Sequence, residues 1–239
     1  ENTSKPTEKE SDALEIYPIL PLRNTVLFPQ QIIPIYIGRE QSLKLISDLP
    51  RGGKKYIVVV AQRDGSLENP TKKDLYNTGT LAMVMKVFDM PDQSRSAIVQ
   101  GLERVYVKEF KNPDPYYKGL VEKVKGSVRR TAELDSIAVN LQDIFKKLIE
   151  IAPYLSEEQY QAISNIQNPA KLADKAIALM NISTNEKQDI LEELDIKERL
   201  EKSTVLINRE IHRIELGEKI QSDVQDEISK SQREYFLRE

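Results

Sequence analysis

The chain has 239 residues with no Cys, no Trp and a single His, and its 35 basic and 38 acidic side chains give a net charge of −3. The absence of Cys excludes disulfides, thiolate metal sites and a cysteine nucleophile, and one His excludes a metal site built from several histidines. No apolar run approaches the roughly 20 residues that cross a bilayer, so we expect a soluble chain without a membrane partner.

The composition changes near residue 127 and divides the chain into two halves. Eight of the nine Gly and ten of the twelve Pro come before this point. Residues 16–126 carry 17 Lys and Arg against 11 Asp and Glu, whereas residues 127–239 carry 16 against 22. Turn residues and β-formers fill the first half, and the second half is nearly free of helix breakers. We therefore expect a β domain over 16–126 and helices after it.

The first half begins with a polar segment, 1–15, which predicts a disordered lead-in. A single helix is expected at 38–49. Short apolar runs separated by turn residues predict five or six strands, and such a set with one helix indicates a small, partly closed barrel. The runs lie at 16–22, 32–37, 56–61, 81–88, 97–107 and 120–124.

The second half carries helical periodicity and helix start signals. Over 137–148 the apolar residues recur on one helical face. Capping patterns mark four helix starts. They are Ser156 with Gln159, Asn168 followed by Pro169, Ser183 with Glu186, and Asp195 with Glu198. We therefore predict an all-α helical bundle over 127–194.

From Asp195 the helical pattern continues to Glu239 and is interrupted only by Gly217. A straight helix of that length would measure about 65 Å. A small bundle cannot bury it, so it projects or pairs. No stop signal precedes Glu239, and we expect a larger protein to continue there. The expected fold class is α+β, with a small β-barrel domain followed by a helical bundle that ends in a long projecting helix.

Motifs for catalysis are absent from the sequence. Gly52-Gly53-Lys54-Lys55 lacks the first Gly and the final Ser or Thr of a phosphate-binding loop, and no nucleophile elbow or zinc-protease motif occurs. His212 and the Glu192-Glu193 pair lie on charged helices, where solvated side chains are the ordinary interpretation. We therefore predict no catalytic, cofactor-binding or metal-binding residue.

Two features of the first half suggest binding. The first is a dense apolar cluster between Pro21 and Pro34, which is either ordinary β-domain core or an exposed recognition surface. The second is the basic excess of this half. Its lysines either contact a nucleic-acid backbone beside stacking aromatic rings or are scattered solubilising charges. They are Lys54, Lys55, Lys72, Lys73, Lys108 and Lys111, near Tyr56, Tyr106 and Phe110.

The sequence from Pro21 to Pro29, PLRNTVLFP, resembles the signature that opens the N-terminal domain of Lon proteases. Further matches follow in order across residues 14–239. They are Gly38-Arg39-Glu40 with Ser42, Asp74-Leu75-Tyr76 with Gly79-Thr80, Gly101-Leu102-Glu103-Arg104, Leu172-Ala173-Asp174, Leu194-Asp195-Ile196 with Glu198-Arg199-Leu200, and 232–239. One departure is Gln30, where the family often has Gly, and a positive-φ turn there is costlier for Gln.

The resemblance implies a PUA-like β domain over 16–126, a helical bundle over 127–194 and a long helix over 195–239. It also implies a parent protein that is an ATP-dependent serine endopeptidase, a cytoplasmic homohexamer that degrades misfolded and regulatory proteins. ATP, Mg²⁺ and the family's Ser-Lys dyad would belong to domains beyond Glu239. This segment would not itself be catalytic or hold a cofactor.

The expected role of the segment is substrate capture through apolar patches. The hypothesis assigns contact with unfolded or degron-bearing proteins to Leu22, Val26, Leu27, Phe28 and Ile33. Two alternatives stay open. One is a nucleic-acid-binding module. PUA-like domains in other proteins bind RNA, and the Lon family is associated with binding to DNA. The other is an assembly element in which the long helix pairs between subunits.

Overall fold

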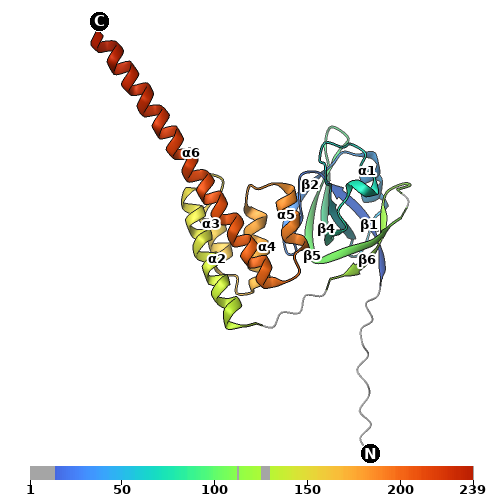
Figure 1. The fold of residues 1–239 in the computed structure, drawn as a ribbon. Helices are drawn as coiled ribbons and strands as arrows, with labels where there is room; N and C mark the ends of the chain where they lie inside the picture. The colour runs from blue at the N-terminus through green and yellow to red at the C-terminus, as the bar shows by residue number, and fades with distance from the viewer. Residues whose placement is uncertain (1–13, 112, 125–129, 239) are drawn as a thin grey trace, which may run out of the picture. The chain divides into compact units, whose positions relative to one another are not determined.

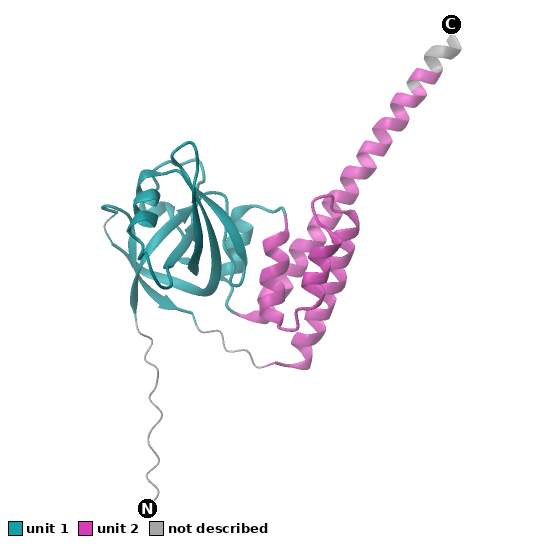
Figure 2. Cartoon of the chain, turned by 180° about the vertical axis from the view of Figure 1, so that it is seen from behind, with its two compact units in different colours: residues 1–127, 181–194 teal, residues 128–180, 195–239 magenta. Residues whose placement is uncertain are grey.

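In the computed structural model of the chain, residues 14–111, 113–124 and 130–238 are described, without the side chains of 231 and 234–238. The chain divides into two compact units, residues 1–127 with 181–194 and residues 128–180 with 195–239 (Figure 2). Most of the lead-in expected over 1–15 lies outside the described residues, as does the expected boundary at 126–127. In the described part, no helix is both long and apolar enough to cross a membrane.

The described part of the first unit contains six strands, two α-helices and a short 3₁₀ helix. The strands are β1 (Glu15–Leu22), β2 (Ile32–Ile37), β3 (Tyr56–Ala61), β4 (Thr78–Asp89), β5 (Arg95–Phe110) and β6 (Lys118–Lys123). The helices are α1 (Glu40–Asp48), η1 (Lys72–Asp74) and α5 (Thr184–Glu192). The expected six strands and the expected helix at 38–49 are therefore confirmed, with ends that differ by a few residues.

The strand pairings close a ring. β1 pairs with β3 in parallel, and antiparallel pairs then run from β3 to β4, β5 and β6. Because β6 also pairs with β1, these five strands return to their starting point. β5 is long enough to take a further partner, and its first half pairs with the edge strand β2 (Figure 1). The α+β class with a small barrel-like sheet is confirmed.

Two apolar clusters fill this unit. One lies against α1 and is formed by Leu20, Leu22, Leu27, Ile35, Ile37, Leu45, Ile46, Ile57, Val59, Ala82, Val84, Ala97 and Val99. The other is formed by Ile19, Val58, Val60, Leu75, Leu81, Val105, Val107, Tyr117 and Val121. Alternate residues of β3 enter alternate clusters, because successive side chains of a strand point to opposite faces. This explains why β3 is apolar throughout.

Helix α5 belongs to the unit that contains the sheet, whereas the sequence placed all of 127–194 in a helical bundle. The Gln188 side chain donates from Nε2 to the backbone oxygen of Thr78 on β4 at 3.0 Å. Arg104 on β5 donates from Nε to the backbone oxygen of Leu191 at 2.9 Å. Tyr76 donates its hydroxyl to Asn185 Oδ1 at 3.0 Å. These hydrogen bonds join residues about a hundred positions apart, and helical periodicity carries no information about them.

The second unit is formed by α2 (Ala132–Ile151), α3 (Glu157–Ser164), α4 (Pro169–Leu179) and α6 (Ile196–Arg238). The four expected start signals all function as caps. Ser156 and Ser183 form capping boxes, and Asn168 Oδ1 accepts from the backbone N–H of Ala170 and Lys171. Asp195 Oδ1 accepts from the backbone N–H of Glu198 at 3.0 Å. Local side-chain chemistry therefore sets where these helices begin.

The core of the second unit joins α2, α3, α4 and the first half of α6. Its fully buried side chains include Leu141, Phe145, Leu148, Ile163, Leu172, Ile177, Leu200 and Ile207. The 43-residue helix α6 continues past this core, and its described side chains after Ile211 are mostly exposed (Figure 1). The expected long projecting helix is therefore present.

Candidate functional site

Strands β2 and β4, which flank β5, and the residue directly after β4 present an exposed apolar surface on the side opposite the core. We call it the outer face and define it by Ile32, Pro34, Tyr36, Met85, Phe88 and Met90. Its large side chains, other than Pro34, are each between 39% and 66% exposed. Exposed apolar side chains gathered on one face of a sheet are a candidate binding surface.

The register of the sheet brings these side chains together. Tyr36 lies opposite Ser96, which lies opposite Phe88. Strands β2 and β4 therefore each place an aromatic ring on the same face of the sheet, one on either edge of β5. Ile33, Ile35 and Ile37 alternate with the exposed residues of β2 and face the core cluster. The alternation fixes one face for the core and leaves the other in solvent.

An irregularity in β4 enlarges the outer face. Val84 pairs with Val99 and Lys86 with Ile98, which leaves Met85 as an extra residue in a β-bulge. Bulged residues are re-aimed relative to the pleat, and the consecutive residues Met85 and Lys86 are both exposed here. Methionine and aromatic side chains adapt to differently shaped apolar partners. The outer face therefore suits contact with varied apolar chains and contains no group for bond chemistry.

Two contacts organise the polar rim of the outer face. Tyr36 donates its hydroxyl to Asp92 Oδ2 at 3.1 Å, which links β2 to the turn between β4 and β5. The Lys86 Nζ lies 4.8 Å from the centroid of the Phe88 ring. Hydrogen bonds from Ser94 lower the pKa of Asp92, and the Tyr36 hydroxyl lowers it further, so the carboxylate stays charged at neutral pH.

The five residues expected to contact substrate occupy a different place. Leu22, Val26, Leu27 and Phe28 are buried in the β unit, and Phe28 is fully enclosed. Ile33 is partly buried and packs against the core cluster. These side chains are therefore core, and the assignment of substrate contact to them is corrected. An apolar side chain that is already enclosed by its own domain has no surface left for a partner.

Motif residues hold this buried segment in place. Thr80 donates its hydroxyl to the backbone oxygen of Leu27 at 2.5 Å. The Gly101 backbone oxygen accepts from Gln30 N and its N–H donates to Gln31 O, each at 2.8 Å. A Cβ on Gly101 would lie 2.3 Å from the backbone oxygen of Phe28. The motifs around Phe28, Thr80 and Gly101 thus meet in one packed arrangement that is structural.

Ile32 lies in the apolar cluster expected between Pro21 and Pro34, but the other residues of the outer face were missed because sheet register is not visible in a sequence. One signal was available, since three of the four Met residues fall between positions 83 and 90. A second was the alternation of Ile32, Pro34 and Tyr36 with the isoleucines of the same strand. Neither shows that β2 and β4 flank the same strand.

Some of the basic residues of this unit form ion pairs with carboxylates. Lys108 Nζ lies 2.6 Å from Glu122 Oε2, and the hydrogen bond to Glu122 raises the pKa of Lys108. Lys123 lies 3.1 Å from Glu103 in the same way. Tyr56 and Phe110 pack against a core cluster rather than standing free as stacking platforms. Among the described residues, no three His, Asp or Glu side chains come together as a metal ion would require.

The chain resembles known proteins along most of its length. Residues 16–209 match the family model "ATP-dependent protease La (LON) substrate-binding domain". A Lon protease of Dictyoglomus thermophilum is 41% identical over 228 residues, which are 95% of this chain and 28% of that protein. A Lon protease of Koribacter versatilis is 40% identical over 241 residues, covering 100% of this chain and 29% of that protein. The chain therefore spans less than a third of these relatives.

Two solved structures share the fold. The N-terminal domain of a Lon protease from the Mycobacterium avium complex superposes with a TM-score of 0.65 and 17% identity, over 81% of this chain and 98% of that one. A Lon N-terminal domain protein from Xanthomonas campestris gives a TM-score of 0.56 and 18% identity, over 79% of this chain and 96% of that one. At this level of identity the likeness concerns the fold.

Proposed function

Because this chain belongs to the family of Lon protease substrate-binding domains, we propose that it captures unfolded or degron-bearing proteins for an ATP-dependent serine endopeptidase. In this proposal the segment binds and does not cleave. Nucleotide and Mg²⁺ binding and the Ser-Lys chemistry belong to other parts of a protein that works as a cytoplasmic homohexamer on misfolded and regulatory proteins. The family match and the curated relatives support this assignment.

The observation that carries the proposal is the outer face. Unfolded proteins differ from folded ones in exposing apolar side chains, so a receptor for them needs an accessible apolar surface. The outer face supplies aromatic and thioether side chains in solvent on a rigid sheet. We assign substrate contact to the outer face in place of Leu22, Val26, Leu27, Phe28 and Ile33.

Side chains rather than backbone would make most of the contact. β2 is the edge strand of the sheet, and an edge strand can pair with an added extended chain. Pro34 in the middle of β2 has no N–H and interrupts such a ladder. Contacts through Tyr36, Phe88 and Met85 tolerate many sequences, as binding to varied unfolded chains requires.

The test is a binding titration with a permanently unfolded, fluorescently labelled protein. The double variant Tyr36→Ser and Phe88→Ser removes two exposed rings and should weaken binding about tenfold or more, because buried aromatic anchors dominate such contacts. The control is Tyr106→Ser. Tyr106 is on the same unit and is 39% exposed, as Phe88 is, but lies in the half of β5 that does not pair with β2.

The control should bind like the parent chain. Equal binding by the folded double variant, or an equal loss in Tyr106→Ser, would contradict the proposal. Circular dichroism and the unfolding midpoint establish that each variant is folded. Exposed positions are suited to this test because their replacement leaves the core intact.

A second candidate role is self-association through α6. Leu216, Ile220, Val224 and Ile228 recur every four residues and are each about half exposed. Such a stripe on a helix is stabilised by a partner helix. Sedimentation over a range of concentrations tests this role. Ile220→Glu with Val224→Glu should abolish concentration-dependent association, and its persistence in that variant would remove the candidate.

A further inference from the structure

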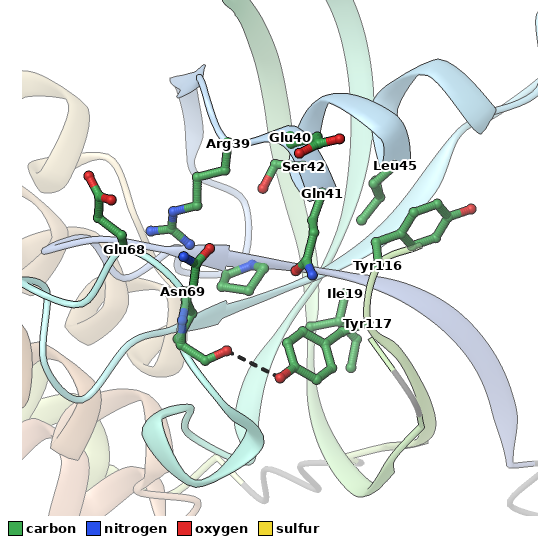
Figure 3. A pocket seen from close by; sticks show the side chains of 12 residues that line it. Ile19, Arg39, Glu40, Gln41, Ser42, Leu45, Glu68, Asn69, Tyr116 and Tyr117 are labelled. Carbon is green, nitrogen blue, oxygen red and sulfur yellow. Dashed lines mark hydrogen bonds between the residues drawn. The ribbon is translucent and has the colours of Figure 1, made fainter. Parts of the chain in front are cut away.

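A pocket of about 140 Å³ opens beside the N-terminus of α1. Its polar side is formed by Arg39, Gln41 and Ser42 together with Asn69, and Pro21 and Leu45 contribute an apolar wall (Figure 3). The pocket shares no residue with the outer face.

The helix end at the pocket has no cap. Arg39 is the N-cap residue of the nine-residue helix α1, and no side chain makes a capping hydrogen bond there. The first N–H groups of a helix have no partner within the helix, and the helix dipole adds positive charge at this end. Uncapped helix ends of this kind favour an anionic ligand.

Ser42 provides an independent observation. This residue is only 8% exposed and it lines the pocket. Its hydroxyl has no hydrogen-bond partner among the residues that the structure describes. In Figure 3 the hydroxyl is turned toward the space between Arg39 and Gln41. The hydroxyl is reached through the pocket rather than sealed from solvent, so a ligand in the pocket can complete its hydrogen bond.

Arg39 adds a positive charge to the same space. Its Nη2 donates to Gln62 Oε1, and this bond orients the guanidinium. Burial lowers the pKa of Arg39, and the nearby Arg23 lowers it further, whereas Glu68 acts in the opposite direction. A partly desolvated guanidinium is stabilised by an anion, and its fork of donors matches a carboxylate. Figure 3 shows the Glu68 carboxylate directed away from Ser42 and Gln41.

We propose that this pocket binds the carboxylate of the C-terminal residue of a polypeptide. Arg39, the Ser42 hydroxyl and the uncapped N–H groups of α1 hold the two oxygens, while the wall of Pro21 and Leu45 faces the terminal side chain. The inference rests on the proposed function, because it names the part of a protein substrate that this second surface would take.

Size and charge favour a chain end over a free phosphate. Ligand pockets for whole small molecules measure roughly 300–1,000 Å³, and about 140 Å³ admits one residue. Glu40 and Glu68 are exposed at the rim and would repel a dianion more strongly than a monoanion. A carboxylate with an attached apolar side chain satisfies both the polar and the apolar wall.

The test titrates the chain with a short unstructured peptide that ends in leucine, as the free acid and as the C-terminal amide. Backbone amide resonances of Gln41 and Ser42 report on the site. The free acid should shift them and bind about tenfold more tightly than the amide, since hydrogen bonds to a charged group are the strong ones. Inorganic phosphate is titrated separately as a third arm.

Two variants locate the effect. Ser42→Ala should weaken binding of the free acid severalfold and leave binding of the amide unchanged. Arg39→Lys, which keeps the charge and removes the fork, should also weaken it. The matched control is Ser47→Ala on the same helix, where the hydroxyl already donates to the backbone oxygen of Leu43. Ser47→Ala should bind as the parent chain does.

Equal affinity for acid and amide, or resonances of Gln41 and Ser42 that do not move, would overturn the assignment. Phosphate that saturates the site at a lower concentration than the free acid would overturn it as well. This failure is distinguishable from failure of the proposed function. If the outer-face variant Tyr36→Ser and Phe88→Ser binds the peptide amide more weakly than the parent chain does, substrate capture by the outer face is supported even though the pocket assignment fails.

Discussion

Asp174 on α4 and Arg199 on α6 form a buried ion pair, with 3.3 Å between Asp174 Oδ1 and Arg199 Nη1. Both side chains are almost completely shielded from solvent. The two residues lie 25 positions apart in the sequence, in the motifs Leu172-Ala173-Asp174 and Glu198-Arg199-Leu200. The pair joins helices α4 and α6 of the second unit, which gives these motifs a structural role.

Removing one partner of the pair should destabilise the second unit strongly. Asp174→Asn leaves the Arg199 charge buried and should lower the free energy of unfolding by about 3 kcal/mol or more. Chemical denaturation followed by circular dichroism measures this. The control is Glu133→Gln, which breaks the exposed pair with Lys197 and should leave the midpoint nearly unchanged. Similar effects of the two variants would contradict the account.

A glycine in the turn after Phe28 should make the first unit more stable. Gln30 has a φ of +64°, so a residue other than Gly holds a left-handed backbone conformation in this turn. Gln30→Gly removes that strain and should raise the free energy of unfolding by about 0.5–1 kcal/mol. The neighbouring change Gln31→Gly should have the opposite sign, because Gln31 Oε1 accepts from the backbone N–H of Phe28 at 3.0 Å. Thermal unfolding checks both expectations, a higher midpoint for Gln30→Gly and a lower midpoint for Gln31→Gly.

Gly101 should tolerate no side chain. Its missing Cβ leaves room for the backbone oxygen of Phe28, so Gly101→Ala should displace the buried residues 26–28 and destabilise the first unit by about 2 kcal/mol or more. Gly52→Ala is the control, since a Cβ there meets nothing within 4 Å. Amide hydrogen exchange of Leu27 and Phe28 should rise in Gly101→Ala alone. Unchanged exchange would show that the segment is not held by this contact.

Acidification should weaken the second unit through Glu210. Hydrogen bonds from Arg213 at 2.6 and 2.8 Å lower the pKa of Glu210 from its ordinary 4.5, and the Tyr154 hydroxyl lowers it further. The unfolded state then binds the proton at a higher pH than the folded state does. The stabilisation is complete above pH 4.5 and is lost as the pH falls through the folded pKa.

Glu210→Gln should flatten that pH dependence. Unfolding midpoints measured between neutral pH and about pH 3 compare the two chains. The parent chain should lose stability more steeply than the variant below pH 4.5. Parallel curves would show that Glu210 does not contribute to acid sensitivity.

Local chemistry made much of the fold predictable. The strands, the caps at Ser156, Asn168, Ser183 and Asp195 and the long helix follow from patterns within a few residues. Helix α5 was assigned to the wrong unit because its hydrogen bonds with strands β4 and β5 join distant segments. Periodicity identifies a helix and its apolar face but does not identify what that face packs against.

The candidate site was less predictable, for the same reason. The segment around Phe28 is apolar enough to be either surface or core, and only the contacts of Thr80 and Gly101 decide for core. Tyr36 and Phe88 become neighbours across β5 through sheet register, which depends on the pairing of β2 with β5, such as Tyr36 with Ser96, far apart in the sequence. An apolar cluster in a sequence shows that burial or binding occurs, and the structure shows which.

Site-specific photo-crosslinking tests most directly whether the outer face contacts unfolded protein. Tyr36→p-benzoylphenylalanine and Tyr106→p-benzoylphenylalanine each carry the same reactive group at an exposed position of the β unit. With a labelled unfolded protein, position 36 should give abundant crosslinks and position 106 few. Equal yields at the two positions, or a higher yield at 106, would contradict the account.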